Sequence, residues 1–176
     1  MTAHVDGTGV QPFEEVYRTY ADSVFAFCWS QTGNHSDAED LAADVFASAF
    51  AAYTSAGPDP DKLRAWLMRI ARNAVIDHYR RNGRRSAILA RFFSGSSERA
   101  DTDIEGEVVM RDEVTHVIGK MARLRERERL VIGLRIASNL SYAEMASVLG
   151  ISEHAATMAT RRALEKLRVL CEDGAP

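Results

Sequence analysis

Apolar residues recur every three or four positions along most of this sequence, which is the spacing of amphipathic helices. The clearest repeat lies in residues 61–81, where the apolar positions gather on one side of a helix. They are Leu63, Trp66, Leu67, Ile70, Ala71, Ala74 and His78. The opposite side carries Arg69, Arg72, Asn73 and Arg80, together with Ala65 and Ile76. We predict a helix that turns one face to a core and an arginine-rich face to a polyanion.

Two further helices are predicted before this one. Residues 13–32 keep apolar side chains at helical spacing until a Gly-Asn pair interrupts them. Ser36 or Asp37 is then expected to cap a second helix, because short polar side chains accept hydrogen bonds from a first turn. The inward positions of that helix are Leu41, Val45, Phe46, Ala49 and Phe50. The glycine- and proline-rich stretch 54–62 is predicted to be a loop.

The second half of the chain opens with two predicted helices, over residues 108–121 and 125–138. The inward positions of the second are Leu130, Val131, Leu134 and Ile136. Ser141 and Glu144 then have the spacing of a capping box, which begins a short helix that Gly150 ends. Ile151 is expected to plug the core, and Ser152 to cap a long helix that reaches about residue 171. This order of elements is the helix-turn-helix pattern.

The last helix separates an inward from an outward set of residues. The inward set is Ala156, Ala159, Ala163, Leu167 and Leu170. The outward set is His154, Met158, Arg161, Arg162 and Glu165, with Thr157 and Arg168 at the flank. The N-terminal part of such a helix enters the major groove, so its outward side chains reach base edges. We therefore expect DNA contacts from His154, Thr157, Met158, Arg161 and Arg162.

Together these elements predict an all-α protein with two small helical domains. The first is an N-terminal helical bundle over residues 13–85, and the second is the helix-turn-helix domain over 108–171. Residues 86–107 are rich in Arg, Ser, Gly and Asp and are expected to form a partly flexible linker. Residues 1–12 are expected to be a flexible N-terminus, and residues 172–176 a tail.

Composition excludes several classes of protein. The 176 residues are 46% hydrophobic and 27% charged, as is ordinary for a soluble globular protein. No apolar run approaches the roughly 20 residues of a membrane span, and the first residues do not resemble a signal peptide. We expect a cytoplasmic protein without membrane insertion. Cys28 and Cys171 lack a CxxC partner, so we expect free thiols and neither a metal nor a cofactor.

Charge is strongly segregated although the net charge is only −3. Residues 1–62 carry ten acidic and two basic side chains, whereas residues 63–100 carry nine basic and two acidic ones. A chain divided in this way is expected to have more than one kind of partner. Its acidic total argues against strong unaided binding to duplex DNA, because nonspecific affinity grows with the number of phosphates neutralised. DNA binding is therefore expected to need another protein.

Three motifs in this order resemble the extracytoplasmic-function group of bacterial RNA polymerase sigma factors. The run 37–41, DAEDL, with Val45 and Phe46 resembles the segment that binds the coiled coil of the largest polymerase subunit. Residues 66–81 resemble the helix that meets the minus-ten promoter element. Residues 130–163 resemble the domain that binds the minus-thirty-five element. The resemblance covers nearly the whole chain and implies a transcription initiation factor with no enzymatic activity.

The resemblance also implies roles for individual residues. The implied polymerase-binding residues are Asp37, Glu39, Asp40, Leu41, Asp44 and Phe46. The implied minus-ten DNA-binding residues are Leu63, Arg64, Arg69, Arg72, Asn73, Arg80 and Arg81. The implied partners are core RNA polymerase, through its coiled coil and its flap, promoter DNA and an anti-sigma factor. The final helix departs from the family pattern at Thr157 and Ala159, where phosphate-binding charge is missing.

Two other classes compete with this interpretation. A stand-alone helix-turn-helix regulator would explain residues 120–171 but would leave the acidic second helix and the 66–81 motif without a role. A polymerase-binding protein that reads no promoter is favoured only if the changes at Thr157 and Ala159 abolish DNA contact. Transcription by core polymerase on promoter DNA would separate these classes.

Overall fold

The computed structural model describes residues 11–92 and 110–172. Its α-helices are α1 (Phe13–Thr32), α2 (His35–Ala56), α3 (Leu63–Phe92), α4 (Met110–Met121), α5 (Glu126–Ile136), α6 (Tyr142–Leu149) and α7 (Glu153–Glu172), with a short 3-10 helix at Pro60–Lys62. The predicted all-α fold with two helical regions is confirmed, and no strand occurs in the described ranges. Most of the expected flexible N-terminus, most of the linker and most of the tail lie outside these ranges.

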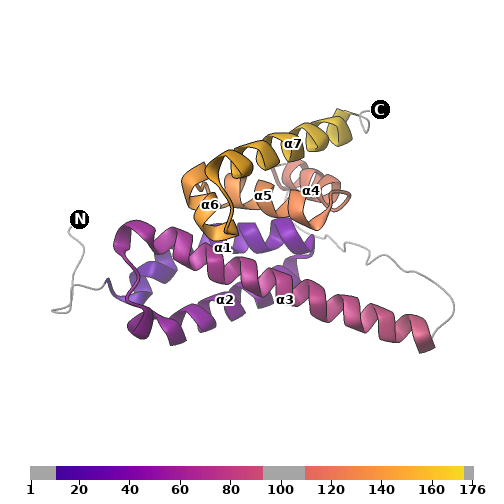
Figure 1. The fold of residues 1–176 in the computed structure, drawn as a ribbon. Helices are drawn as coiled ribbons and strands as arrows, with labels where there is room; N and C mark the ends of the chain where they lie inside the picture. Colours follow the sequence, from indigo (N-terminus) through magenta and orange to yellow (C-terminus); the bar gives the residue numbers. More distant parts are fainter. Residues whose placement is uncertain (1–10, 93–109, 173–176) are drawn as a thin grey trace.

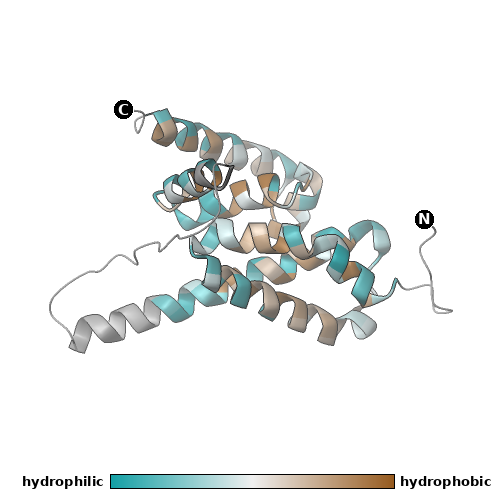
Figure 2. Cartoon of the chain, turned by 180° about the vertical axis from the view of Figure 1, so that it is seen from behind, coloured by the Kyte–Doolittle hydropathy of each residue, from teal (hydrophilic) through white to brown (hydrophobic). Residues whose placement is uncertain are grey.

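The helices form two layers that lie directly against each other (Figure 1). Helices α1, α2 and α3 pack together in one layer, and α4 to α7 form the other. The layers meet where α1 contacts α5 and where α3 contacts α6. One continuous cluster of buried apolar side chains runs through both layers, from Val24 and Leu67 to Leu134 and Ala163. In the view from behind (Figure 2), brown hydrophobic and teal hydrophilic stretches alternate along the helices of both layers.

The helix ends agree with the sequence signals in most places. Ser141 and Glu144 form the predicted capping box, and Gly150 ends α6 with a φ of 68°. Ser152 caps α7, because its hydroxyl accepts a hydrogen bond from Ala155 N at 3.1 Å. At α2 the prediction was wrong, since the cap is Asn34, whose Oδ1 accepts from Asp37 N at 2.9 Å. Gly33, in the left-handed region with a φ of 69°, ends α1 and brings Asn34 into place.

The long helix α3 has different bounds from those predicted. It was expected to begin near Asp61 and end near Arg81, but it runs from Leu63 to Phe92. The stretch after Arg81 contains one glycine, which costs a helix only about 1 kcal/mol and is followed by good helix formers. The predicted loop before α3 is also shorter, because α2 extends to Ala56.

Five inward or outward assignments were wrong. Phe50 is 66% exposed because it lies at the edge of the bundle, where its ring covers Phe13 at 5.2 Å. Ile136 is 65% exposed because it lies about 200° around α5 from the buried Leu134. Ile151 is 41% exposed in the turn before α7.

The other two errors concern α3. Ala65 was assigned to the polar face but is only 6% exposed, because α6 covers that side of α3. His78 was assigned to the core but is partly exposed and bonds to Asn82 instead. Met68 and Val75, which the periodicity missed, are buried. Helix α3 is thus covered from two sides along its first half.

Candidate functional surfaces on α2, α3 and α7

The acidic face of α2 consists of four exposed carboxylates: Asp37, Glu39, Asp40 and Asp44. Asp37 lies in the first turn, where a negative charge is favoured by the helix dipole. His35 Nδ1 lies 3.4 Å from the carboxylate of Glu39. This face therefore presents its negative charge to solvent with few partners of its own.

Two of the residues predicted on this surface lie beneath it. Leu41 is 2% exposed and Phe46 is 8% exposed, so both belong to the core under the acidic face. The sequence prediction missed two exposed aromatic residues nearby, Tyr17 and Phe50. The ring of Tyr17 lies 4.7 Å from that of Phe46. An aromatic residue at an apolar helical position looks like a core residue, so the sequence carried no signal for this exposed patch.

The arginine-rich face of α3 is divided among three environments. In the middle of the helix, Arg72 Nη1 donates to Asn73 Oδ1 at 3.3 Å, and Asn73 is exposed. Arg80 is exposed and pairs with Asp77 at 3.4 Å. Leu63, predicted to meet DNA, is only 2% exposed and packs with Val16 and Tyr53. Leu63 therefore anchors the start of α3 rather than lining its surface.

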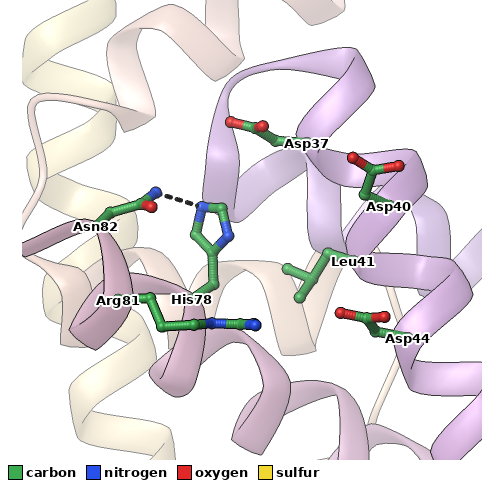
Figure 3. A pocket seen from close by; sticks show the side chains of 7 residues that line it. All are labelled: Asp37, Asp40, Leu41, Asp44, His78, Arg81 and Asn82. Carbon is green, nitrogen blue, oxygen red and sulfur yellow. Dashed lines mark hydrogen bonds between the residues drawn. The ribbon is translucent and has the colours of Figure 1, made fainter. Parts of the chain in front are cut away.

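At the far end of this face, α2 and α3 share a pocket of about 240 Å³ (Figure 3). Asp37, Asp40 and Asp44 line it from α2, and Arg81 extends towards them from α3. Asn82 Nδ2 and His78 Nε2 lie 2.9 Å apart on the α3 side. The sequence predicts separate ligands for the acidic and basic helices. Their charged surfaces also meet each other at this pocket.

At the near end, the arginines of α3 contact α6. Arg64 Nε donates to Glu144 Oε1 at 3.3 Å, and Arg69 Nη2 donates to Ser147 Oγ at 3.0 Å. A groove of about 460 Å³ runs between the loop before α3 and α6, lined by Lys62, Trp66 and Arg69 together with Ala143, Glu144 and Ser147. Contacts between residues so distant in sequence were not predicted.

The carboxylate of Glu144 accepts hydrogen bonds both within α6 and from α3. It closes the capping box of α6 by accepting from Ser141 N at 2.7 Å, and it accepts from Arg64. Burial raises the pKa of the Glu144 carboxyl, but hydrogen bonds from Ser141 and the nearby Arg64 charge outweigh it, so the net pKa lies below its ordinary value. Glu144 is therefore ionised at neutral pH.

Helix α7 presents an open surface at its N-terminal half. His154, Arg161 and Arg162 are exposed, and Thr157 and Met158 are partly exposed. Thr157 Oγ1 already donates to Glu153 O at 2.9 Å. Within residues 11–82 and 113–172, neither Arg161 nor Arg162 forms an ion pair, whereas Arg168 pairs with Glu165 at 2.8 Å and Glu172 at 2.6 Å. The guanidinium groups available to a ligand are thus those of the first half.

The described part of the chain contains no group of three His, Cys, Asp or Glu side chains placed to hold a metal ion. None of its helices is long and apolar enough to cross a membrane.

Comparison with known protein families gives two matches in chain order. Residues 16–85 match the family described as sigma-70 region 2, and residues 121–169 match sigma-70 region 4. The RNA polymerase sigma factor CnrH of Cupriavidus metallidurans is 31% identical over 78% of this chain and 74% of its own length. The sigma factor SigM of Bacillus subtilis is 28% identical over 92% of this chain and 96% of its own. This chain is an extracytoplasmic-function sigma factor of the sigma-70 family.

Solved structures agree with this assignment. The structure of CnrH with the cytosolic domain of CnrY superimposes with a TM-score of 0.68 and 27% identity, covering 93% of this chain and 89% of that one. RpoE of Bartonella quintana with its anti-sigma factor NepR gives a TM-score of 0.69 and 25% identity, covering 93% and 98%.

The family fixes the general function of the protein. This sigma factor directs RNA polymerase to promoters and is not an enzyme. Region 2 comprises α1, α2 and most of α3, and region 4 comprises α5 to α7. The match of residues 16–85 argues against a stand-alone helix-turn-helix regulator, because that class of protein accounts only for residues 120–171.

Proposed function

We propose that the sigma factor divides its work among three surfaces. The acidic face of α2 binds core polymerase, the arginine-rich face of α3 captures the minus-ten element as single strands, and the first half of α7 reads the minus-thirty-five element. The observation that carries this proposal is the segregation of charge: four exposed carboxylates on α2 and, on the next helix, a row of guanidinium groups.

Polymerase binding through α2 combines charge with apolar contact. The four carboxylates suit a basic partner surface, and charge complementarity of this kind speeds association and fixes register. Tyr17 on α1 and Phe50, six residues beyond Asp44 on α2, are exposed and offer the aromatic anchors that binding sites favour. Leu41 and Phe46 support the face from below, because both are buried. We expect the coiled coil of the largest subunit to occupy this surface.

Minus-ten binding through α3 uses the arginines and the groove beside them. Single-stranded DNA is held by positive charge along the backbone and by stacking of bases on aromatic side chains. Arg64, Arg69, Arg72 and Arg80 supply the charge, and Trp66 in the groove supplies an aromatic surface. Asn73 is exposed and can hydrogen-bond a base edge.

Minus-thirty-five binding through α7 rests on its open N-terminal half. Arg161 and Arg162 are exposed and suit guanine or phosphate, and Met158 suits a thymine methyl group. The same surfaces are exposed to an anti-sigma factor, the partner named for the similar structure of RpoE. We place the protein in the cytoplasm, where polymerase and chromosome are found.

One experiment with two variants tests this division. The purified chain, core polymerase and promoter DNA selected from a genomic library are combined, and polymerase affinity and run-off transcripts are measured. Asp40→Arg should weaken polymerase binding by about tenfold, because it places a cation on the surface that meets a basic partner. Glu113→Arg, an exposed residue of α4, changes net charge equally and should leave polymerase affinity near that of the wild type.

The second variant separates DNA capture from docking. Asn73→Ala with Arg80→Ala removes two exposed side chains of α3. We expect normal polymerase affinity but fewer open complexes, detected as loss of permanganate-reactive thymines at the minus-ten region. Arg18→Ala, an exposed arginine of α1, is the matched control. Normal opening by the double variant would remove α3 from its proposed role.

A further inference from the structure

An apolar side chain lies at the centre of the outward face of α7. The buried residues that mark the inward side of this helix are Ala156, Thr160 and Ala163. At 100° per residue, Met158 lies on the opposite side. It is partly exposed, and among the described residues its neighbours Ala159 and Leu164 pack against the core cluster whereas Met158 does not. The core therefore gives no reason for an apolar side chain at this position.

The side chains around Met158 offer no free hydrogen-bond donor. Residues 155–160 contain only two side-chain donors, the hydroxyls of Thr157 and Thr160. Both donate to backbone carbonyls of α7 one turn earlier, at 2.9 Å and 2.8 Å. Each hydroxyl has a single hydrogen, so neither can donate to a base edge as well. The polar donors of this half of α7 are thus His154 on one side and Arg161 and its neighbour on the other.

A surface of this kind suits one base better than the others. In the major groove, thymine is the only base that presents a methyl group, and apolar side chains contact it there. The edges of the other bases present hydrogen-bonding groups, which lose their water without gaining a partner when an apolar side chain covers them. A methionine side chain is flexible and polarisable, so it adapts to the shape of a base edge. Met158 therefore favours thymine over cytosine, the pyrimidine without the methyl group.

Base contacts carry much of the binding at this surface because phosphate contacts are few. Residues 153–162 carry two guanidinium groups, those of Arg161 and Arg162, and one carboxylate, that of Glu153. The affinity of a protein for any duplex grows with the number of phosphates that it neutralises. With so few cations, α7 depends on the bases that it contacts, and the loss of one base contact should be measurable.

The spacing along α7 places the methyl contact relative to the arginine contacts. Arg161 and Arg162 lie three and four residues after Met158, which is roughly 4.5–6 Å along the helix axis. Neighbouring bases of one strand are about 3.4 Å apart along a duplex. A thymine contacted by Met158 should therefore lie about one or two base pairs from a guanine contacted by either arginine.

We propose that Met158 is a specificity-determining residue, which selects thymine at one position of the minus-thirty-five element by contact with its C5 methyl group. The inference rests on the proposed role of α7 in reading that element. Selection depends on the methyl group itself and not on the hydrogen-bonding atoms of thymine, because Met158 and its neighbours in residues 155–160 offer no free donor to them.

The first experiment finds the position. Holoenzyme assembled from this chain and core polymerase selects promoter fragments from a library randomised over the minus-thirty-five element. Each thymine of the selected element is then replaced in turn by deoxyuridine, which lacks only the methyl group. One replacement, about one or two base pairs from a guanine, should weaken binding about fourfold, as expected for the burial of one methyl group. An element in which no replacement weakens binding would overturn the proposal.

Four pyrimidines at that position separate methyl contact from hydrogen bonding. Thymine and 5-methylcytosine carry the methyl group, whereas uracil and cytosine lack it, and each is paired with its complementary purine. Thymine should bind about fourfold more tightly than uracil, and 5-methylcytosine should exceed cytosine by a similar factor. Hydrogen-bond reading would instead make thymine equal to uracil and 5-methylcytosine equal to cytosine, and this result would contradict the inference.

A substitution on the protein assigns the preference to its residue. Met158→Ala should remain folded, because alanine favours a helix, and should bind the methylated and unmethylated pyrimidines within about twofold of each other. Val169→Ala removes another exposed apolar side chain of α7, in the C-terminal half, and should keep the wild-type preference. A methyl preference that persists in Met158→Ala would overturn the proposal. Holoenzyme that binds a scrambled minus-thirty-five element as well as the selected one would contradict the proposed role of α7, and this inference with it.

Discussion

Either of two polar residues near the start of α2 could form its N-terminal cap. Ser36 and Asn34 both have side chains that can accept a hydrogen bond from a helix N-terminus. The structure assigns the cap to Asn34, because Gly33 turns the chain so that Asn34 is extended, with φ −123° and ψ 132°, as the helix begins. Ser36 already lies inside the helix and is exposed. A difference of two positions in the capping residue decides which amide groups of the acidic helix are satisfied.

Asn34→Ala should therefore destabilise the chain by about 1 kcal/mol, since the amide of Asp37 loses its acceptor. Ser36→Ala should leave the free energy of unfolding unchanged or slightly raised, because alanine favours a helix interior. Urea unfolding followed by circular dichroism measures both. Equal losses in the two variants would show that the cap is shared.

Helix α7 shows how two arginines of one element can differ in function. Arg168 is held between Glu165 and Glu172, so its guanidinium is already neutralised. Arg161 lies seven residues earlier, is exposed and belongs to the half of the helix that enters a groove. The position of acidic partners along α7 thus sets which end can bind DNA.

Arg161→Ala should reduce the affinity of the polymerase holoenzyme for promoter fragments containing a minus-thirty-five element by about 1–3 kcal/mol. Arg168→Ala removes the same side chain from the C-terminal half and should change that affinity little. Competition with fragments whose minus-thirty-five element is scrambled measures the specific part. If the two variants behaved alike, the N-terminal half of α7 would not be the reading surface.

The elements themselves were largely predictable from the sequence because their signals are local. Glycines at the ends of α1 and α6, the Ser141 capping box and the helical spacing of apolar residues all act within a few residues. Assignments failed where a second layer decides burial. Ala65 was assigned to the surface but is covered by α6, and no local signal in α5 indicates that Gly133 lies against Gln31 and Ser30 of α1.

In the candidate sites too, features set by the local sequence were predictable, and features set by contacts between helices were not. The exposed carboxylates of α2 and the arginines of α3 and α7 were readable from charge and spacing alone. The burial of Leu63 and the partners of Arg64 and Arg69 were not, because they depend on contacts between helices. Leu63 packs with Val16 and Tyr53, and the partners of the two arginines lie about 80 positions further along the chain. No periodicity within one helix carries that information.

At the scale of the whole molecule, the two regions share one core although they are separate in sequence. Apolar side chains of α1 and α3 belong to the same buried cluster as those of α5, α6 and α7. Each region alone would be near the size at which a single core is marginally stable. The layers therefore support each other's folding as long as they stay in contact, and this support is lost when they open.

Thermal unfolding should reveal this dependence. The wild-type chain is expected to unfold in one calorimetric transition, because separating the layers exposes apolar surface of both. In Gly133→Leu the side chain drives α5 from α1, so two transitions should appear, both at or below the wild-type Tm. Gly119→Ala should keep one transition at a slightly higher Tm, because it improves helix propensity without meeting a neighbour.

A single unshifted transition in Gly133→Leu would mean that contact at Gly133 does not couple the layers. Two transitions in the wild type would mean that the shared core is too weak to join them.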